Sequence, residues 1–226
     1  MRRLGAEFLG TFCLVFAGTG AIVINDVSAG AVSHVGIALT FGLIVLAMIY
    51  ALGEVSGAHL NPAVTIGFFL ARRFEGKWIA PYVASQILGA IPASLILGEM
   101  FPAHSTLGAT FPSGAESQSF ILETILTFML MFVILSVSTG SKEKGVLAGV
   151  AIGAIIALEA LFAGPISGAS MNPARSLAPA LVVMQLNSLW IYLSAPLLGA
   201  AVAVGACRCI QANGCCCPGA REAAST

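Results

Sequence analysis

The apolar positions fall into six long runs that are separated by short polar segments. The runs cover residues 4–24, 34–53, 78–98, 119–139, 145–164 and 188–208. About 20 apolar residues, each rising about 1.5 Å along a helix, are enough to cross the hydrocarbon core of a bilayer. Two shorter segments, 61–71 and 172–183, begin with Asn-Pro-Ala and can reach only about half as far. The pattern predicts an all-α membrane protein with six transmembrane helices and two re-entrant half-helices.

Composition supports lipid as the solvent of this chain. Hydrophobic residues make up 58% of the 226 positions, and charged residues make up 9%. An ordinary soluble domain carries about 25% charged residues. The ten basic and ten acidic residues cancel, so no net charge is available to attract an anionic partner. These values exclude a soluble enzyme, a disordered chain and a nucleic-acid-binding protein.

The N-terminal run follows Arg2 and Arg3, as the apolar core of a signal peptide would. A signal core is about 7–15 residues long and ends at a small-residue cleavage site. The run 4–24 is longer and lacks such a site. We therefore expect it to stay in the protein as the first span.

The basic residues predict the orientation in the membrane. With six spans, the loops 25–33 and 99–118 lie on one side, and they contain no Lys or Arg. The opposite side carries Arg2, Arg3, Arg72, Arg73, Lys77, Lys142, Lys144, Arg208 and Arg221. By the positive-inside rule both termini are cytoplasmic, in a plasma membrane or a bacterial inner membrane.

The chain contains an internal repeat. Segments 56–63 and 167–174 agree at six of eight positions, and a glutamate, Glu7 or Glu123, lies early in the first span of each half. The repeats cover about 4–98 and 119–208. Each half has three spans, an odd number, so the second copy is inverted in the membrane, as in transporters with broken helices. We assign 1–208 to a channel domain and 209–226 to a cytoplasmic, Cys-rich tail.

The two Asn-Pro-Ala starts are expected to meet at the membrane centre. Asn caps a helix N-terminus, and Pro suits its first turn. Two facing N-termini concentrate positive potential that repels cations, while amide groups still bind a neutral oxygen. Irregular backbone at this depth is tolerated where it lines a cavity. The predicted pore centre is Asn61, Pro62, Ala63, Asn172, Pro173 and Ala174, and the predicted lining loops contain Gly57, Ala58, His59, Gly168 and Ser170.

These motifs resemble the aquaporin superfamily, the major intrinsic proteins, over about residues 4–208. The segments 163–176 and 6–12, together with Tyr192-Leu193, are similar to its nodulin-26-like branch. Ser176 stands where glycerol facilitators would have Asp. The resemblance implies one pore per subunit, a homotetramer and, for Glu7 and Glu123, a role in holding the re-entrant loops. The short termini favour a bacterial member.

The resemblance also places a selectivity filter on the extracellular side of the two Asn-Pro-Ala motifs. By motif spacing its four positions are Phe41, Ala160, Ala169 and Arg175. A charge at membrane depth is costly, so Arg175 is expected to be functional. Water-selective relatives usually have His where this chain has Ala160. Two alanines widen the constriction and make one wall apolar, unless neighbours such as Leu161 or Phe162 refill the space.

The sequence therefore predicts a passive channel, not an enzyme, which needs no cofactor and binds no nucleic acid. It conducts water and small uncharged solutes, such as glycerol or boric, arsenous or silicic acid, and excludes protons and ions. A strict water channel of the same fold is one alternative. A proton-coupled secondary transporter is another, and it would need Glu159 or Glu54 on the solute pathway.

Two features stay open at this level. Glu159 either supports a re-entrant loop, which we favour, or faces the pore mouth. The C-terminal cysteines are expected to be reduced thiols, with no metal site assigned. A soft-metal thiolate site or lipidation are the alternatives for Cys207, Cys209, Cys215, Cys216 and Cys217.

Overall fold

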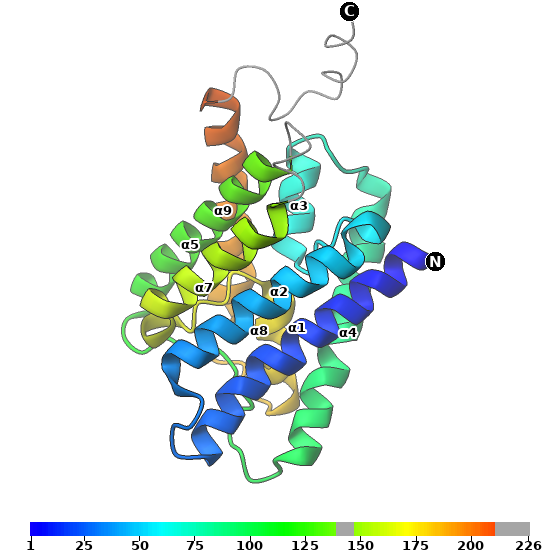
Figure 1. Ribbon diagram of the computed structural model, residues 1–226. Helices are drawn as coiled ribbons and strands as arrows, with labels where there is room; N and C mark the ends of the chain where they lie inside the picture. The colour runs from blue at the N-terminus through cyan, green and yellow to red at the C-terminus, as the bar shows by residue number, and fades with distance from the viewer. Residues whose placement is uncertain (139–146, 211–226) are drawn as a thin grey trace, which may run out of the picture.

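The computed structural model describes residues 1–138 and 147–210, and it is helical as predicted (Figure 1). In this part of the chain, six helices are long and apolar enough to span a membrane. They are α1 (Arg2–Val27), α2 (Ser33–Ser56), α4 (Ile79–Met100), α5 (Glu116–Val137), α7 (Ala148–Ser167) and α9 (Leu189–Ile210). A 3-10 turn, Gly76–Trp78, leads into α4. The half-helices are α3 (Pro62–Leu70) and α8 (Pro173–Val182).

The helices that lead into the half-helices end in the same way. α2 stops at Gly57 with φ of 87°, and α7 stops at Gly168 with φ of 84°. Both glycines are left-handed caps, a conformation that glycine adopts without a Cβ penalty. The chain then turns back within the membrane instead of leaving it. The six-span prediction with two re-entrant segments is confirmed.

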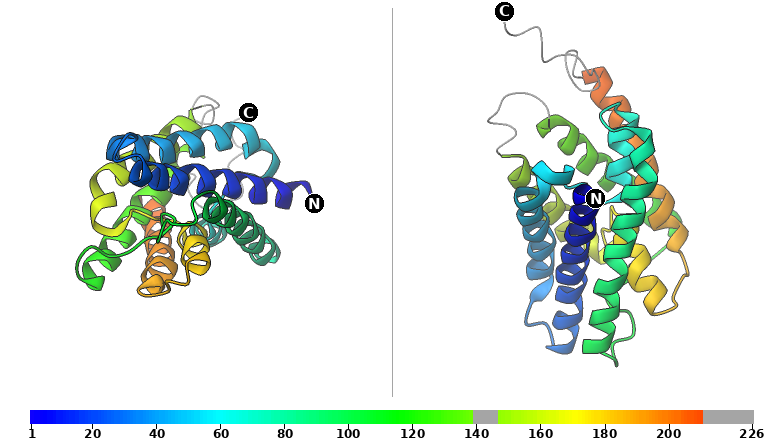
Figure 2. Two further views of the ribbon diagram at one scale, coloured as in Figure 1. Left: turned by 90° about the horizontal axis from the view of Figure 1, so that it is seen from below. Right: turned by 90° about the vertical axis from the view of Figure 1, so that its right-hand side faces the viewer.

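The two halves interlock around a shared centre (Figures 1 and 2). α1 packs on α4 in the first half, and α5 packs on α9 in the second. Each half-helix also crosses to the other half, since α8 packs on α4 and α3 packs on α9. α2 and α7 join the halves at a close crossing, where a Cβ on Gly153 would come within 2.6 Å of the Gly42 carbonyl oxygen. Small residues permit such close crossings between membrane helices.

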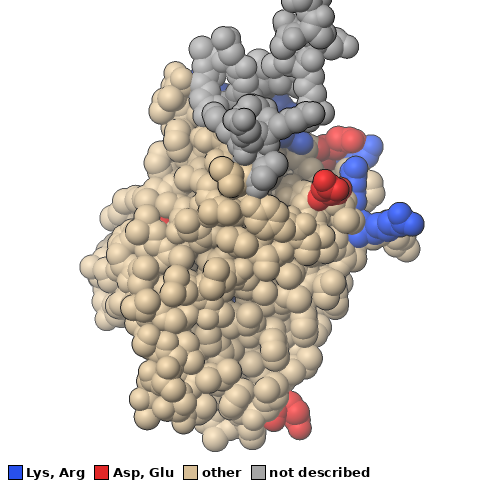
Figure 3. Space-filling model, viewed as in Figure 1, with Lys and Arg blue, Asp and Glu red and all other residues tan. Residues whose placement is uncertain are grey.

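The outer surface is apolar over most of its area. Many large side chains that face outward are Leu, Ile, Val and Phe. On the face shown in Figure 3, Lys and Arg gather toward the end that carries the N-terminus. Lys142, Lys144 and Arg221 of the predicted basic set lie outside the described residues. The apolar outer surface suits contact with lipid or with other subunits.

Candidate functional site: a candidate pore

Two asparagines cap the half-helices at the centre of the molecule. The Asn61 Oδ1 accepts from the Ala63 N–H at 2.8 Å, and the backbone at Asn61 is extended. The Asn172 Oδ1 accepts from the N–H groups of Ala174 at 3.0 Å and Arg175 at 3.3 Å. Pro occupies the first helical turn in both cases. Each cap satisfies N–H groups that the helix itself leaves without a partner.

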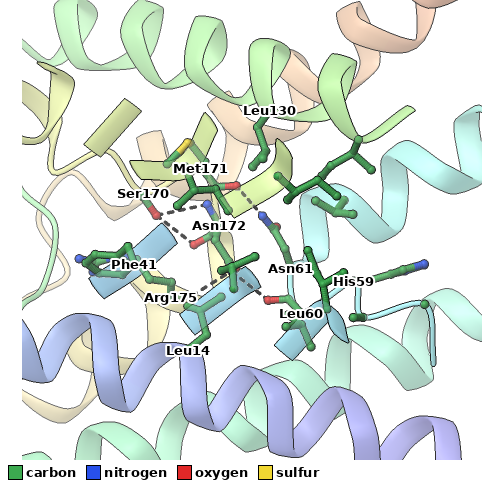
Figure 4. A pocket seen from close by; sticks show the side chains of 18 of the residues that line it. Leu14, Phe41, His59, Leu60, Asn61, Leu130, Ser170, Met171, Asn172 and Arg175 are labelled. Carbon is green, nitrogen blue, oxygen red and sulfur yellow. Dashed lines mark hydrogen bonds between the residues drawn. The ribbon is translucent and has the colours of Figure 1, made fainter. Parts of the chain in front are cut away.

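The same side chains tie the two re-entrant loops together (Figure 4). The Asn61 Nδ2 donates to the Met171 carbonyl at 2.7 Å, and the Asn172 Nδ2 donates to the Leu60 carbonyl at 2.9 Å. An amide nitrogen carries two hydrogens, and this bond uses only one. The second hydrogen of each amide is left for the cavity that both asparagines line.

Both loops carry the same unusual backbone. Ala58 and Leu60 have φ of 46° and 51°, and Ala169 and Met171 have φ of 41° and 53°. Positive φ is costly for residues with a Cβ and persists only where surrounding contacts impose it. The same strained backbone occurs at equivalent positions of both repeats, so the two loops are copies of one structural motif.

Two buried carboxylates supply the contacts that impose this backbone. The Glu7 Oε1 accepts from the His59 N–H at 2.9 Å, and its Oε2 accepts from the Leu60 N–H at 2.7 Å. Glu123 accepts in the same way from the N–H groups of Ser170 and Met171, both at 2.9 Å. The geometry is the one that the resemblance implied for both glutamates.

Further anchors of the loops were missed by sequence reasoning. The Tyr82 hydroxyl donates to the Ser56 carbonyl at 2.9 Å, and the Tyr192 hydroxyl donates to the Ser167 carbonyl at 2.7 Å. Both tyrosines are fully buried, one on α4 and one on α9. Their equivalent places in the two repeats are a signal that aligning the last helix of each half could have found.

A cavity of about 150 Å³ runs along these loops. Its lining includes the predicted residues Phe41, Gly57, Ala58, His59, Asn61, Ala160, Ala169, Ser170, Asn172 and Arg175. Its other lining residues are mostly aliphatic or aromatic, among them Leu14, Val45, Ile49, Val64, Phe68, Leu130, Ile134, Ile152 and Ile156. Of the other predicted residues, Gly168 caps α7, and Pro62, Ala63, Pro173 and Ala174 are buried in the first turns of the half-helices. A wall of this composition offers polar contacts at few points only.

The four predicted filter residues come together on this cavity. Arg175 is buried, with 1% of its surface exposed, and its guanidinium carbon lies 5.2 Å from the centre of the Phe41 ring. The Arg175 Nη1 donates to the Gly108 carbonyl at 2.8 Å. Among the described residues, Arg175 forms no ion pair. Its positive charge is therefore held in place by a neutral carbonyl and an aromatic face.

The loop between α4 and α5 makes contacts around the predicted filter residues that the sequence did not predict. Besides Gly108, it contributes Thr110, whose hydroxyl donates to the Ser176 hydroxyl at 2.8 Å. Ser176 in turn shares a 2.5 Å hydrogen bond with Ser170, a residue of the cavity wall. Ser176 thus takes part in a neutral hydroxyl chain beside Arg175, where an aspartate would have added a negative charge.

Glu159, the third glutamate expected to support a loop, has surroundings unlike those of Glu7 and Glu123. It is fully buried on α7, yet neither carboxyl oxygen has a hydrogen-bond partner among the described residues. It does not belong to the cavity lining either, although its neighbour Ala160 does. α7 turns Ala160 toward the cavity and Glu159 away from it, because successive helical residues differ by about 100°. Among the described residues, Glu159 therefore makes no hydrogen bond to a re-entrant loop, and support of a loop by Glu159 stays a prediction.

The remaining alternatives from the sequence are located as follows. Glu54 is exposed near the end of α2, and Phe162 is half-exposed on the outer surface. Neither Leu161 nor Phe162 belongs to the cavity lining. The described residues contain no cluster of three or more metal-ligating side chains. Cys207 is buried and Cys209 is exposed, while Cys215, Cys216 and Cys217 lie outside the described residues.

Six membrane-length helices surround a cavity, and two capped half-helices meet at its centre. This is the architecture of a membrane channel. The family model for major intrinsic proteins matches residues 1–206. The chain therefore belongs to the major intrinsic protein family, and it is a multi-pass membrane protein and not an enzyme.

Individual relatives agree with this assignment. The chain is 49% identical over 215 residues to aquaporin NIP1-4 of Oryza sativa subsp. japonica, covering 95% of this chain and 78% of that one. It is 43% identical over 204 residues to aquaporin NIP6-1 of Arabidopsis thaliana, covering 90% and 67%. An X-ray structure of the aquaglyceroporin from Plasmodium falciparum superposes with a TM-score of 0.83 at 27% identity, covering 92% and 96%. The two sequence relatives are plant proteins of the nodulin-26-like type, so they lend no support to a bacterial origin.

Proposed function

We propose that the protein is a passive channel for water and small uncharged solutes, such as glycerol or the neutral boric, arsenous and silicic acids. The observation that carries this proposal is the filter: Arg175, Phe41 and two alanines, Ala160 and Ala169, line the same cavity, with the Arg175 guanidinium over the Phe41 ring. Relatives named aquaporins and an aquaglyceroporin agree with it.

Charge exclusion follows from the groups that surround the cavity. The N-termini of α3 and α8 meet at the centre, and each contributes a partial positive charge. Arg175 adds a full positive charge that no described carboxylate pairs with. A cation or hydronium entering the cavity meets all three. A neutral molecule instead gains hydrogen bonds from the free donors of Arg175 and from the two asparagine amides.

In this proposal the solute size limit is set by the two alanines of the filter. Methyl groups at positions 160 and 169 leave space that a His or Thr would fill. Leu161 and Phe162 do not refill that space, since neither lines the cavity. A solute with hydroxyl groups along one side and carbon along the other fits this arrangement, because its hydroxyls reach Arg175 while its carbons face the alanines and Phe41.

The assembly and the membrane are part of the same proposal. We place the protein in the plasma membrane, with both termini in the cytoplasm, as a homotetramer with one pore in each subunit. The basic residues support the orientation, the plant relatives suggest the plasma membrane, and the apolar outer face suits contact with other subunits.

A proton-coupled transporter gains no support from the structure. It would need a titrating carboxyl on the pathway, but Glu159 lies outside the cavity lining and Glu54 is exposed at a helix end. The strict water channel differs from the proposal only in its size limit, so it is an outcome of the test.

Stopped-flow light scattering on proteoliposomes tests the proposal. Vesicles with the protein are compared with empty vesicles in an impermeant osmolyte, in glycerol and in boric acid. We expect fast shrinkage in all three, followed by protein-dependent re-swelling in at least one of the two solutes, without an increase in proton leak. Water flux without solute re-swelling would leave the strict water channel, and solute flux that depends on a proton gradient would support the transporter.

A further inference from the structure

The Phe41 ring of the filter rests directly against the backbone of α1. It does so at Gly18, which is buried and has no side chain. A Cβ added to Gly18 would lie 2.6 Å from both Cδ1 and Cζ of Phe41, and closer still to Cε1. Carbon atoms do not approach this closely, so the ring occupies the volume that any side chain at position 18 would need.

The other side of the ring faces the pore. Phe41 lines the cavity, and the Arg175 guanidinium lies over its ring. The Phe41 ring therefore lies between the α1 backbone at Gly18 and the cavity. A displacement of the ring away from Gly18 moves it toward the cavity, where the Arg175 guanidinium also lies.

The helix that carries Phe41 cannot retreat to make room. Gly42, the next residue of α2, is in contact with α7, where a Cβ on Gly153 would lie 2.6 Å from the Gly42 carbonyl oxygen. Backbone meets backbone at this crossing, so it has no flexible side chain that could yield. The clash of a methyl group at Gly18 would consequently be relieved by movement of the Phe41 ring into the cavity that it lines together with Ala160 and Ala169, and not by movement of α2.

From this geometry we infer that Gly18 is a specificity-determining position of the channel, although it does not line the pore. Because Gly18 has no side chain, the Phe41 ring can pack against α1, and Gly18 thereby sets the width of the filter together with the two alanines. This inference rests on the proposed function, since it concerns the upper size limit for neutral solutes. Gly18 is a positioning residue, because it acts on the solute only through Phe41.

The test compares two glycine-to-alanine variants on the same helix. A Cβ at Gly20 would meet its nearest neighbour, a Leu97 methyl, at 3.4 Å, which is ordinary contact. Gly20→Ala is therefore the matched control for Gly18→Ala. We expect Gly18→Ala to lower glycerol permeability about tenfold and water permeability only about twofold, because a methylene-sized change discriminates by about that factor. Gly20→Ala should leave both unchanged.

A second pair of variants separates this effect from a folding defect. Phe41→Ala removes the three atoms that a Cβ at position 18 would approach most closely. Adding Gly18→Ala to Phe41→Ala should then have no effect on the ratio of glycerol to water permeability. An unchanged ratio in Gly18→Ala alone, or an equal drop in both backgrounds, would overturn the inference.

The outcome can be read independently of the proposed function. If the wild-type protein passes water but no glycerol or boric acid, the proposed solute class is wrong. Gly18→Ala should then lower water permeability relative to Gly20→Ala, again only when Phe41 is present. Equal water permeability of the two alanine variants in that case would overturn the role of Gly18 as well.

Discussion

Three buried glutamates show that burial alone does not assign a role to a carboxyl group. Glu7 and Glu123 each accept hydrogen bonds from two loop N–H groups and a serine hydroxyl, and Glu7 also accepts one from Gln86. Glu159 is equally buried and accepts none among the described residues. The first two compensate strained backbone, whereas the third carries only the cost of its own burial.

Replacing Glu123 or Glu159 by leucine should therefore have opposite consequences. Glu123→Leu leaves two backbone N–H groups and a hydroxyl unpaired, so we expect a loss of about 3 kcal/mol or more in stability and no functional channel. Glu159→Leu removes a buried carboxyl without breaking any described hydrogen bond, and should change stability by less than about 1 kcal/mol or increase it. Thermal unfolding of the two variants in detergent measures the contrast. Equal destabilisation would show that Glu159 has a structural partner after all.

Arg175 is the residue on which charge exclusion depends most. Arg175→Gln removes the positive charge, and with it the Nη1 donor to the Gly108 carbonyl, but leaves an amide donor at this position. We expect proton or small-cation leak to rise about tenfold or more, since a full charge in a low-dielectric site is worth well over 1.4 kcal/mol. Water permeability should change little. A pH-sensitive dye inside proteoliposomes reports the leak, and an unchanged leak would assign exclusion to the half-helices alone.

At the scale of elements, the half-helices are held by caps that also act as links. Each asparagine accepts from its own helix and donates to the opposite loop. The pore centre is therefore one cooperative unit built from both repeats. A substitution at one capping asparagine should therefore disturb the re-entrant loop of the other half.

Asn61→Asp tests this coupling, because it separates the cap from the link. The carboxylate can still accept from the Ala63 N–H, but it cannot donate to the Met171 carbonyl. Two oxygens then face each other, and the centre gains a negative charge. We expect stability to fall by about 1–3 kcal/mol and cation conductance to appear. Thermal unfolding and vesicle potential measurements follow the two effects. Wild-type stability would contradict the linking role of the amide.

The elements were predictable from the sequence because lipid imposes simple rules on them. Run length predicted the six spans, the doubled Asn-Pro-Ala predicted the half-helices, and the odd number of spans in each half predicted their inversion. Motif spacing also brought Phe41, Ala160, Ala169 and Arg175 to one cavity. These features depend on local chemistry and on distances along the chain.

What could not be predicted depends on contacts between distant segments. The Gly108 carbonyl that holds Arg175 carries no side-chain signal at all. The position of Gly18 behind Phe41 depends on how α1 and α2 cross, and the lack of partners for Glu159 depends on which way α7 is turned. The hydrophobic pattern and the motif spacing specify neither how two helices cross nor how a helix is rotated about its axis.

At the scale of the whole molecule, one chain encloses a cavity inside an apolar exterior. Both halves contribute to the cavity wall, since the four predicted filter residues and the two capping asparagines come from both repeats. Most of the wall is apolar, and its polar side chains are few: Arg175, the two capping asparagines, His59, Ser138 and Ser170. Selectivity is therefore decided over a short length, where two small side chains have a large effect.

The central claim is that Ala160 and Ala169 open the filter to neutral solutes, and refilling them tests it most directly. The double variant Ala160→His/Ala169→Thr is compared with wild type by stopped-flow light scattering in glycerol and boric acid gradients. We expect solute re-swelling to fall about tenfold or more while water permeability stays within about threefold. Unchanged solute re-swelling in the double variant would show that the size limit is set elsewhere in the pore and would contradict this account.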